Sequence, residues 1–336
     1  MHLRSVRITP VQTLDERARA LADREAWPEL VSLLAEHREE ALRQPSLAML
    51  RGEALLRCGR MHEAAAWLDE VVPVMVRRGD RAATRRAAHL LGAARLELGE
   101  LEEAERDASW ALELGQEDDD DLLVARATNN LGIIANIRGR RESALALYAL
   151  AVPAYQRLGS SRGLAECYHN MAITYRDTDQ LASADEYERR AEEYAREAKD
   201  ARLAALARIG RAEVTLRRGD PALAAATARH AARAIEASGD PIRAADALRV
   251  AGIASQRLGD LDEARELLDR ALDMLRRHGG AFNEAETLRA RAELRVALGQ
   301  MEGAREDAAV ALAIFTRLGA EEAREEILRW VSRLDG

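Results

Sequence analysis

The sequence predicts an all-α fold: a solenoid of about eight helix pairs that ends in a capping helix. The first reason is an internal repeat with a period of 40 residues. The second is the spacing of apolar residues, which is typical of amphipathic helices. The third is composition, because 48% of the 336 residues are hydrophobic, only 4% are aromatic and seven are proline. Such a chain can form long helices with a core of Ala and Leu.

Glycine recurs along the chain at intervals of 40 or 80 residues, and Asp179 fills the one gap in the series. Glycine at such a position ends a helix in the left-handed conformation without a steric penalty. Glu25 marks an earlier turn, and the first unit is therefore shorter than the others. The predicted turns lie at residues 25, 59, 99, 139, 179, 219, 259 and 299.

Small residues keep the same register. Alanine stands five residues after every turn of the 40-residue series, and Gly or Ala stands seven residues before it. The two positions lie on the two helices of a pair, so small side chains there let the helix axes approach closely. A larger side chain would overpack this contact. The alanines are Ala64, Ala104, Ala144, Ala184, Ala224, Ala264 and Ala304.

The apolar residues between Leu261 and Leu275 follow helical spacing, and charged residues occupy the opposite face. Each 40-residue unit is therefore expected to form two helices of about 17 residues joined by tight turns. Pro73 and Pro153 fall inside second helices, where we expect a kink or an early connection.

The array is expected to span residues 13–319, after an N-terminal tail of residues 1–12 and before a capping helix of residues 320–336. Thr13 and Glu16 form a capping-box pattern that opens the first helix. In a repeat array each unit buries its core only against its neighbours, so one continuous superhelix replaces two or three domains.

The pattern resembles the tetratricopeptide repeat (TPR) family. The resemblance rests on Leu91-Gly92, residues 99–104 and Ala111-Leu112, and the same frame recurs in later units. It covers almost the whole chain and implies a right-handed superhelix. The 40-residue period is longer than the family's usual 34 and is similar to that of kinesin light chains and many bacterial sensor and regulator proteins.

The charge balance and the termini exclude several classes of protein. With 58 acidic and 50 basic residues the net charge is −8, which argues against nucleic-acid binding. No stretch is apolar enough to span a membrane, and the N-terminus lacks the apolar run of a signal peptide. Cys58 and Cys167 are too few for a disulfide framework and fit a reducing cytoplasm. Lys199 is the only lysine among 50 basic residues, which we interpret as codon bias in a GC-rich genome, expected to be bacterial, and not as a binding signal.

No motif for catalysis is present in the sequence. The His and Cys residues show no metal-ligand spacing, and neither a phosphate-binding P-loop nor a nucleophile elbow occurs. We therefore predict no enzyme, no cofactor and no metal site, and expect the function to come from the protein surface.

The resemblance implies where a partner binds. In TPR proteins the first helix of each pair lines a concave groove, and the residues thirteen, ten, nine, six and three before the turn face it. These positions are unusually polar in the units that turn at residues 139 and 179. The candidate partner-binding residues are Arg126, Asn129, Asn130, Asn136, His169, Asn170, Arg176, Arg249 and Arg289.

The asparagines are the most informative of these candidates. Asparagine is a mediocre helix former, so four of them on such faces cost helix propensity without a local gain. An amide can donate to a peptide backbone and accept from it at once. Asn130 and Asn170 share the offset at which kinesin-light-chain-like repeats grip a bound main chain. The alternative is that the amides hydrogen-bond between neighbouring helices or face water.

The arginines suggest a ligand with some acidic character, because a guanidinium group suits carboxylates. Neighbouring carboxylates, such as Glu286 beside Arg289, can instead neutralise them. All six tyrosines fall between Tyr148 and Tyr194, overlapping the Asn-rich units. Packing between helices is the simpler interpretation for Tyr168, although Tyr is also common at interfaces.

Three functions fit these features. The preferred one is a scaffold or adaptor, monomeric or weakly dimeric, that binds an extended peptide or a partner helix in the groove. The second is a sensor that responds to a peptide or small metabolite, although that class usually carries a separate output domain. The third is a self-assembling array, against which the charged last helix argues.

Overall fold

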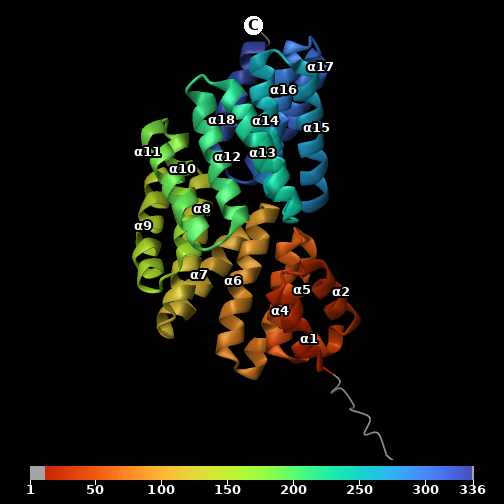
Figure 1. The fold of residues 1–336 in the computed structure, drawn as a ribbon, viewed down its shortest axis with the longest axis vertical. Coiled ribbons are helices and arrows are strands. Elements are labelled where there is room, and N and C mark those ends of the chain that lie inside the picture. Colours follow the sequence, from red (N-terminus) through yellow and green to blue (C-terminus); the bar gives the residue numbers. More distant parts are fainter. Residues whose placement is uncertain (1–11, 335–336) are drawn as a thin grey trace, which may run out of the picture.

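The structure, a computed structural model, describes residues 12–334, and the regular elements within this range are all helices (Figure 1). The all-α solenoid predicted from the sequence is confirmed. The tail predicted for residues 1–12 lies almost entirely outside the described residues. None of the helices between residues 12 and 334 is long and apolar enough to cross a membrane.

Successive helices pack side by side in chain order. The helices are α1 (Leu14–Asp23), α2 (Trp27–Glu36), α3 (Arg38–Arg43), α4 (Pro45–Arg57), α5 (Met61–Arg78), α6 (Arg81–Leu98), α7 (Leu101–Glu117), α8 (Asp121–Ile137), α9 (Arg141–Arg157), α10 (Ser161–Asp177), α11 (Leu181–Glu197), α12 (Ala201–Arg217), α13 (Pro221–Ala237), α14 (Pro241–Leu258), α15 (Leu261–His278), α16 (Ala281–Ala297), α17 (Met301–Arg317) and α18 (Glu321–Leu334).

The short helix α3 was not foreseen. It lies between the first unit and α4, and it ends at Gln44, whose backbone is extended with φ −105° and ψ 113°. The next residue, Pro45, is the first residue of α4. A residue before proline is forced out of the helical region, so the chain must start a new helix there.

Every residue predicted as a turn has a positive φ, whether or not it is glycine. The angle is 55° at Glu25 and 57° at Asp179, in the left-handed region that non-glycine residues rarely adopt. The connections between units use the same conformation, for example at Gly79 and Lys199. Left-handed residues therefore mark the turn inside each helix pair and most of the connections between pairs.

Close contacts between the two helices of a pair follow the small residues. A Cβ atom on Gly252 of α14 would lie 2.8 Å from Leu268 Cγ and 3.4 Å from the carbonyl oxygen of Ala264 on α15. Ala264 is fully buried. The early connection considered for Pro73 and Pro153 does not occur, because α5 and α9 continue past these prolines.

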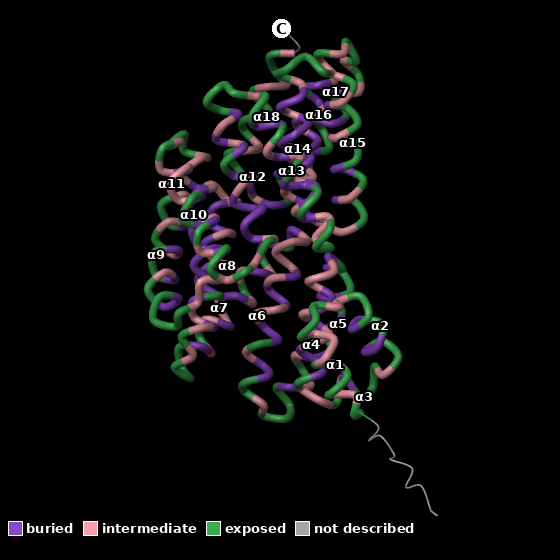
Figure 2. The backbone as a smooth tube through the Cα atoms, viewed as in Figure 1, coloured by how far each residue is buried: buried purple, intermediate pink, exposed green. Residues whose placement is uncertain are grey.

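The first helix of each pair lies on the inner side of the superhelix. Each first helix contacts the first helix of the next pair, from α4 with α6 through to α14 with α16. This second set of contacts shows that the first helices are crowded together, as they must be on the concave side of a curved array. We call the surface that they line the inner face. Buried residues lie where neighbouring helices face one another, on first and second helices alike (Figure 2).

The superhelix also closes on itself, because the starts of α14, α16 and α18 meet the turns that follow α4, α6 and α8. Figure 1 shows the end of α6 against the C-terminal helices. The backbone N–H of Gly280 donates to the carbonyl oxygen of Glu97 at 2.8 Å. Arg141 donates to Glu322, 181 positions away, at 2.6 Å. The expectation that units bury their cores only against neighbours is therefore wrong. We call this contact the seam, formed by Gly59, Glu97 and Arg141 on one side and Pro241, Arg243, Gly280 and Glu322 on the other.

Candidate functional site

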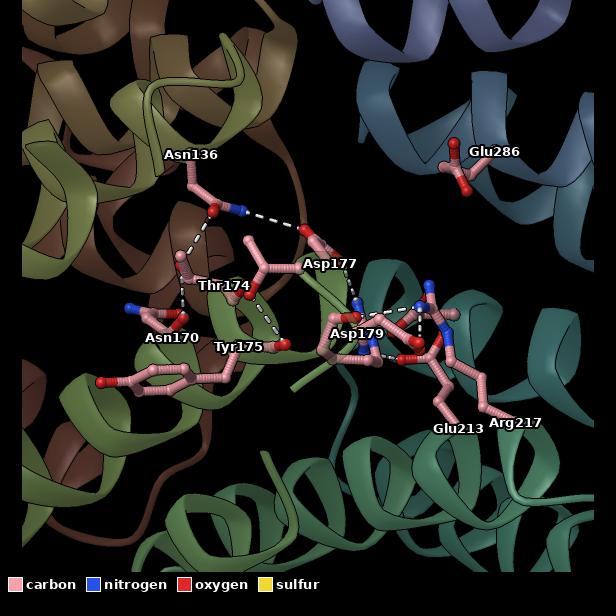
Figure 3. A network of polar contacts seen from close by, with 12 residues as sticks. Asn136, Asn170, Thr174, Tyr175, Asp177, Asp179, Glu213, Arg217 and Glu286 are labelled. Atoms are coloured by element: carbon pink, nitrogen blue, oxygen red, sulfur yellow. Dashed lines mark hydrogen bonds and ion pairs between the residues drawn. The ribbon is translucent and has the colours of Figure 1, made fainter. Parts of the chain in front are cut away.

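The candidate site lies on the inner face, where α8 and α10 run side by side. Asn129 and Asn136 on α8 are buried, with exposed fractions of 6% and 8%. The amide of Asn170 on α10 donates to Asn129 Oδ1 at 3.1 Å. Thr174 donates its hydroxyl to Asn136 Oδ1 at 2.7 Å, and the Asn136 amide donates to Asp177 at 3.3 Å (Figure 3).

These bonds are the alternative that the sequence left open for the asparagines. Asn129 and Asn136 hydrogen-bond between neighbouring helices and hold α8 against α10. Asn170 is partly exposed, with its amide nitrogen engaged by Asn129. Two of the four candidate amides therefore have a clear structural role.

Asn130 differs from the other three. It is partly exposed, but its Nδ2 is buried and has no hydrogen-bond partner. A buried donor without an acceptor costs about 1–3 kcal/mol, so unpaired groups of this kind are rare in folded proteins. Asn130, which carries this unpaired donor, occupies the same position relative to its turn as Asn170 does.

Arg126 precedes Asn130 by one turn of α8, so the two side chains project from the same face of that helix. Arg126 is exposed, and within the described chain no carboxylate pairs with it. The remaining arginines of the candidate set are all paired. Arg249 donates to Glu213 at 2.6 Å and to Asp246 at 2.7 Å. Arg289 donates to Glu286 at 2.6 Å.

Arg176 also pairs with Glu213, which therefore bridges the arginines of α10 and α14. Burial by itself would raise the pKa of Asp246, but Arg249 and Arg176 outweigh it and the net pKa is lowered. The pKa of Glu286 is lowered in the same way, because Arg289 and Arg249 overcome the effect of burial. This part of the inner face is a ladder of alternating charges that neutralise one another.

His169 is turned toward the second helix of its own pair. Its Nδ1 lies 2.9 Å from a carboxylate oxygen of Glu188 on α11, which is 1% exposed. Burial raises the pKa of Glu188. Gly210 on α12 makes room for this carboxylate, because any side chain there would collide with it. The Nδ1 atom of His169 is therefore occupied within the protein.

Sequence reasoning missed His89 on α6. It stands ten residues before its turn, the same offset as Asn129 and Arg249, and this shared offset was the signal that could have found it. Its Nδ1 is buried without a partner. Burial, followed by the charges of Arg126 and Arg86, lowers the pKa of His89 to about 3. His89 is therefore neutral at physiological pH and lies within electrostatic reach of Arg126.

The tyrosines pack mainly against one another. The rings of Tyr175 and Tyr187 stack with centroids 5.1 Å apart, and Tyr168 lies 5.7 Å from Tyr194. Tyr148 is almost completely buried. The packing interpretation is confirmed for Tyr168, which fills space between α10 and α11.

A family model named tetratricopeptide repeat matches residues 44–117, 123–197 and 243–317. Together with the paired helices, the left-handed turns and the small-residue contacts, this match defines the class of protein. The chain belongs to the tetratricopeptide repeat family. A comparison with curated protein sequences gave no match.

Solved structures with the same fold share little sequence with the chain. A Rap conjugation gene regulator of plasmid pLS20, in complex with the Phr* peptide, has a TM-score of 0.66 at 16% identity, covering 88% of this chain and 78% of that one. A Rap protein complexed with competence and sporulation factor has a TM-score of 0.62 at 13% identity, covering 96% of both chains.

A third similar structure is the anaphase-promoting-complex assembly Cut9–Hcn1. Its TM-score is 0.60 at 17% identity, covering 94% of this chain. The present chain spans 55% of that protein's length. At such identities these likenesses show the fold.

Proposed function

We propose that the protein is a non-enzymatic interaction module that binds an extended polypeptide segment on its inner face. The observation that carries this proposal is the pair Arg126 and Asn130 on α8. Both lack partners within the described chain, while the other candidate arginines are paired and the other candidate asparagines are hydrogen-bonded. A ligand bound to the inner face can supply the hydrogen-bond partners that these two side chains lack.

The amides suit the main chain of such a ligand. Asn130 and Asn170 stand at the same offset on adjacent inner helices, so they present the same group at the spacing of one repeat. Asn130 offers an unpaired donor, and Asn170, which donates one N–H to Asn129, keeps its amide oxygen and its second N–H. A bound carbonyl group that accepts from Asn130 Nδ2 would remove the cost of leaving this donor unpaired. Two solved structures of similar fold support a peptide as ligand: the Rap regulator in complex with the Phr* peptide, and NprR in complex with its cognate peptide NprX.

Arg126 gives the ligand its expected acidic character. A guanidinium without a carboxylate partner in the protein forms a charge-assisted hydrogen bond with one supplied from outside. The neutral ring of His89 nearby adds no competing positive charge. We therefore propose a partner segment that carries an Asp or Glu side chain, or a terminal carboxylate, next to the main chain held by Asn130.

The proposal extends to location and mode of action. Cys58 and Cys167 are free thiols, which fits the reducing conditions of a bacterial cytoplasm. A ligand-responsive regulator is the second candidate function, and the self-contact of the superhelix at the seam is the observation that favours it.

The test uses peptides selected from a random library displayed on phage, with the wild-type protein as bait. We expect the selected sequences to be enriched in Asp and Glu. A fluorescent copy of the best binder then measures affinity by anisotropy. Changing Asn130→Ala together with Asn170→Ala should weaken binding at least about tenfold, because a lost hydrogen bond to a ligand typically costs 1 kcal/mol or more.

Asn283→Ala on α16 is the matched control, because it removes an amide from an inner helix outside the candidate site. It should bind like wild type. The thermal midpoint of the double variant should fall by only a few degrees, since one inter-helix hydrogen bond is lost. Unchanged affinity in a folded double variant would contradict the proposed site.

A further inference from the structure

The seam joins parts of the superhelix that are far apart in sequence, and its polar contacts are few. Arg243 on α14 pairs with Glu97 on α6, and Arg141 pairs with Glu322 on α18. One backbone hydrogen bond, from Gly280 to Glu97, crosses between them. Ion pairs of partly exposed side chains contribute little, so these polar contacts by themselves add only modestly to the stability of the seam.

Apolar side chains complete the seam. Leu56 and Leu98, at the ends of α4 and α6, pack against a buried cluster formed mainly by α12 and α14. Met61 at the start of α5 belongs to the same cluster. Any Cβ atom on Gly59 would lie 2.7 Å from Pro241 Cγ, so the two turns touch there without space between them. The helix ends around Gly59 and Leu98 are therefore packed directly against the later part of the superhelix.

A continuous chain of polar contacts links the seam to the candidate site. Arg141, which pairs with Glu322, also lies 3.5 Å from Asp177. Asp177 accepts from the Asn136 amide, and Asn136 accepts from Thr174. The hydroxyl of Thr174 also lies 3.2 Å from the carbonyl oxygen of Asn170, whose side chain contacts Asn129. The relay thus runs from Glu322 of α18 through Arg141 to the asparagines of α8 and α10. Figure 3 shows its inner part, from Asp177 through Asn136 and Thr174 to Asn170.

The unpaired polar atoms of the site are inaccessible in this arrangement. Asn130 Nδ2 and His89 Nδ1 are both buried although their residues are partly exposed. A ligand that uses Asn130 must therefore meet a rearranged inner face. Opening of the seam would release Glu322 from Arg141, the first contact of the relay that ends at Asn129, the residue next to Asn130.

We propose that the seam is a latch that regulates access to the inner face. With the latch closed, the superhelix rests in the described arrangement and the site is partly hidden. A ligand segment binds to the open form and draws the two turns apart. The ligand-dependent half of this inference rests on the proposed function, whereas the latch itself does not.

The test compares wild type with the double variant Arg243→Gln and Glu322→Gln, which removes both ion pairs of the seam. Hydrogen exchange of the Gly280 amide reports the seam directly, and small-angle scattering reports the radius of gyration. We expect Gly280 to exchange at least about tenfold faster and the radius to increase. The phage-selected peptide should bind about tenfold more tightly, because less of its binding energy is spent on opening.

Two further variants separate the latch from general instability. Arg229→Gln removes an ion pair of the same kind between α13 and α15, 2.9 Å from Glu263 and away from the seam, and should leave all three measurements unchanged. The double variant Glu97→Arg with Arg243→Glu keeps this ion pair with its charges reversed. If pairing across the seam is what matters, the Gly280 amide should exchange its hydrogen as slowly as in wild type.

Unchanged Gly280 exchange and an unchanged radius in the double variant would overturn the latch. Faster exchange with unaltered peptide affinity would overturn its coupling to the site. If no selected peptide binds any of the proteins, the proposed function fails together with the coupling, while exchange and scattering still decide whether the latch exists.

Discussion

At the scale of single residues, two side chains without a partner in the described chain, Arg126 and Asn130, distinguish the candidate site. The repeat offsets predicted which side chains reach the inner face, and Arg126 and Asn130 are among them. The offsets could not predict that Asn129 would accept from Asn170 while Asn130 stays without a partner. That difference depends on how the side chains of α8 and α10 meet in three dimensions, which the repeat offsets do not specify.

His89 gives a residue-scale prediction about pH. In the unfolded chain its pKa is about 6.5, whereas in the folded protein it is about 3. Between these two pKa values His89 binds a proton in the unfolded state but not in the folded state. Lowering the pH therefore favours the unfolded state, and the protein loses stability. From pH 7 to pH 5 it should cost about 2 kcal/mol of unfolding free energy.

Urea unfolding at the two pH values measures this cost, with His89→Gln as the comparison. The loss of stability between pH 7 and pH 5 should be about 2 kcal/mol smaller in the variant than in wild type. The other six histidines are common to both proteins and cancel in the difference. An identical pH dependence would show that His89 is not held neutral by its surroundings.

At the scale of helices, most of the structure could be predicted from the sequence. The left-handed turns follow the 40-residue period even where Glu25 or Asp179 replaces glycine. The capping box at Thr13 is formed, with Glu16 bonding back to its N–H at 2.8 Å. These features are local, so residues a few positions apart determine them. The short helix α3 escaped prediction because the first unit departs from the regular period.

The contact of small residues between paired helices gives the element-scale prediction. Ala264 is fully buried, and Gly252 of the preceding helix lies against its backbone. Changing Ala264→Leu should lower the free energy of unfolding by about 1–3 kcal/mol, because the added atoms have no space to occupy. Urea denaturation measures the change.

Ala222→Leu is the matched control, since Ala222 occupies the exposed face of α13. It should change stability by no more than about 0.5 kcal/mol. A similar unfolding curve for wild type and Ala264→Leu would contradict the close approach of the helix axes.

At the scale of the whole molecule, the sequence predicted a continuous superhelix but not its closure. The period reports only how each unit packs against its neighbours. The curvature of the array comes from small rotations that accumulate over several units, and their sum brings Glu97 next to Gly280. Because the proposed latch depends on this closure, it belongs to the scale of the whole molecule.

The central claim is that the inner face of α8 and α10 receives the ligand segment. The most direct measurement is photo-crosslinking, with benzoylphenylalanine placed in the phage-selected peptide and the crosslinked residues identified by mass spectrometry. We predict crosslinks within residues 126–137 and 161–177, and their loss when unlabelled peptide competes. Crosslinks confined to the outer helices α7, α9 and α11 would contradict the claim.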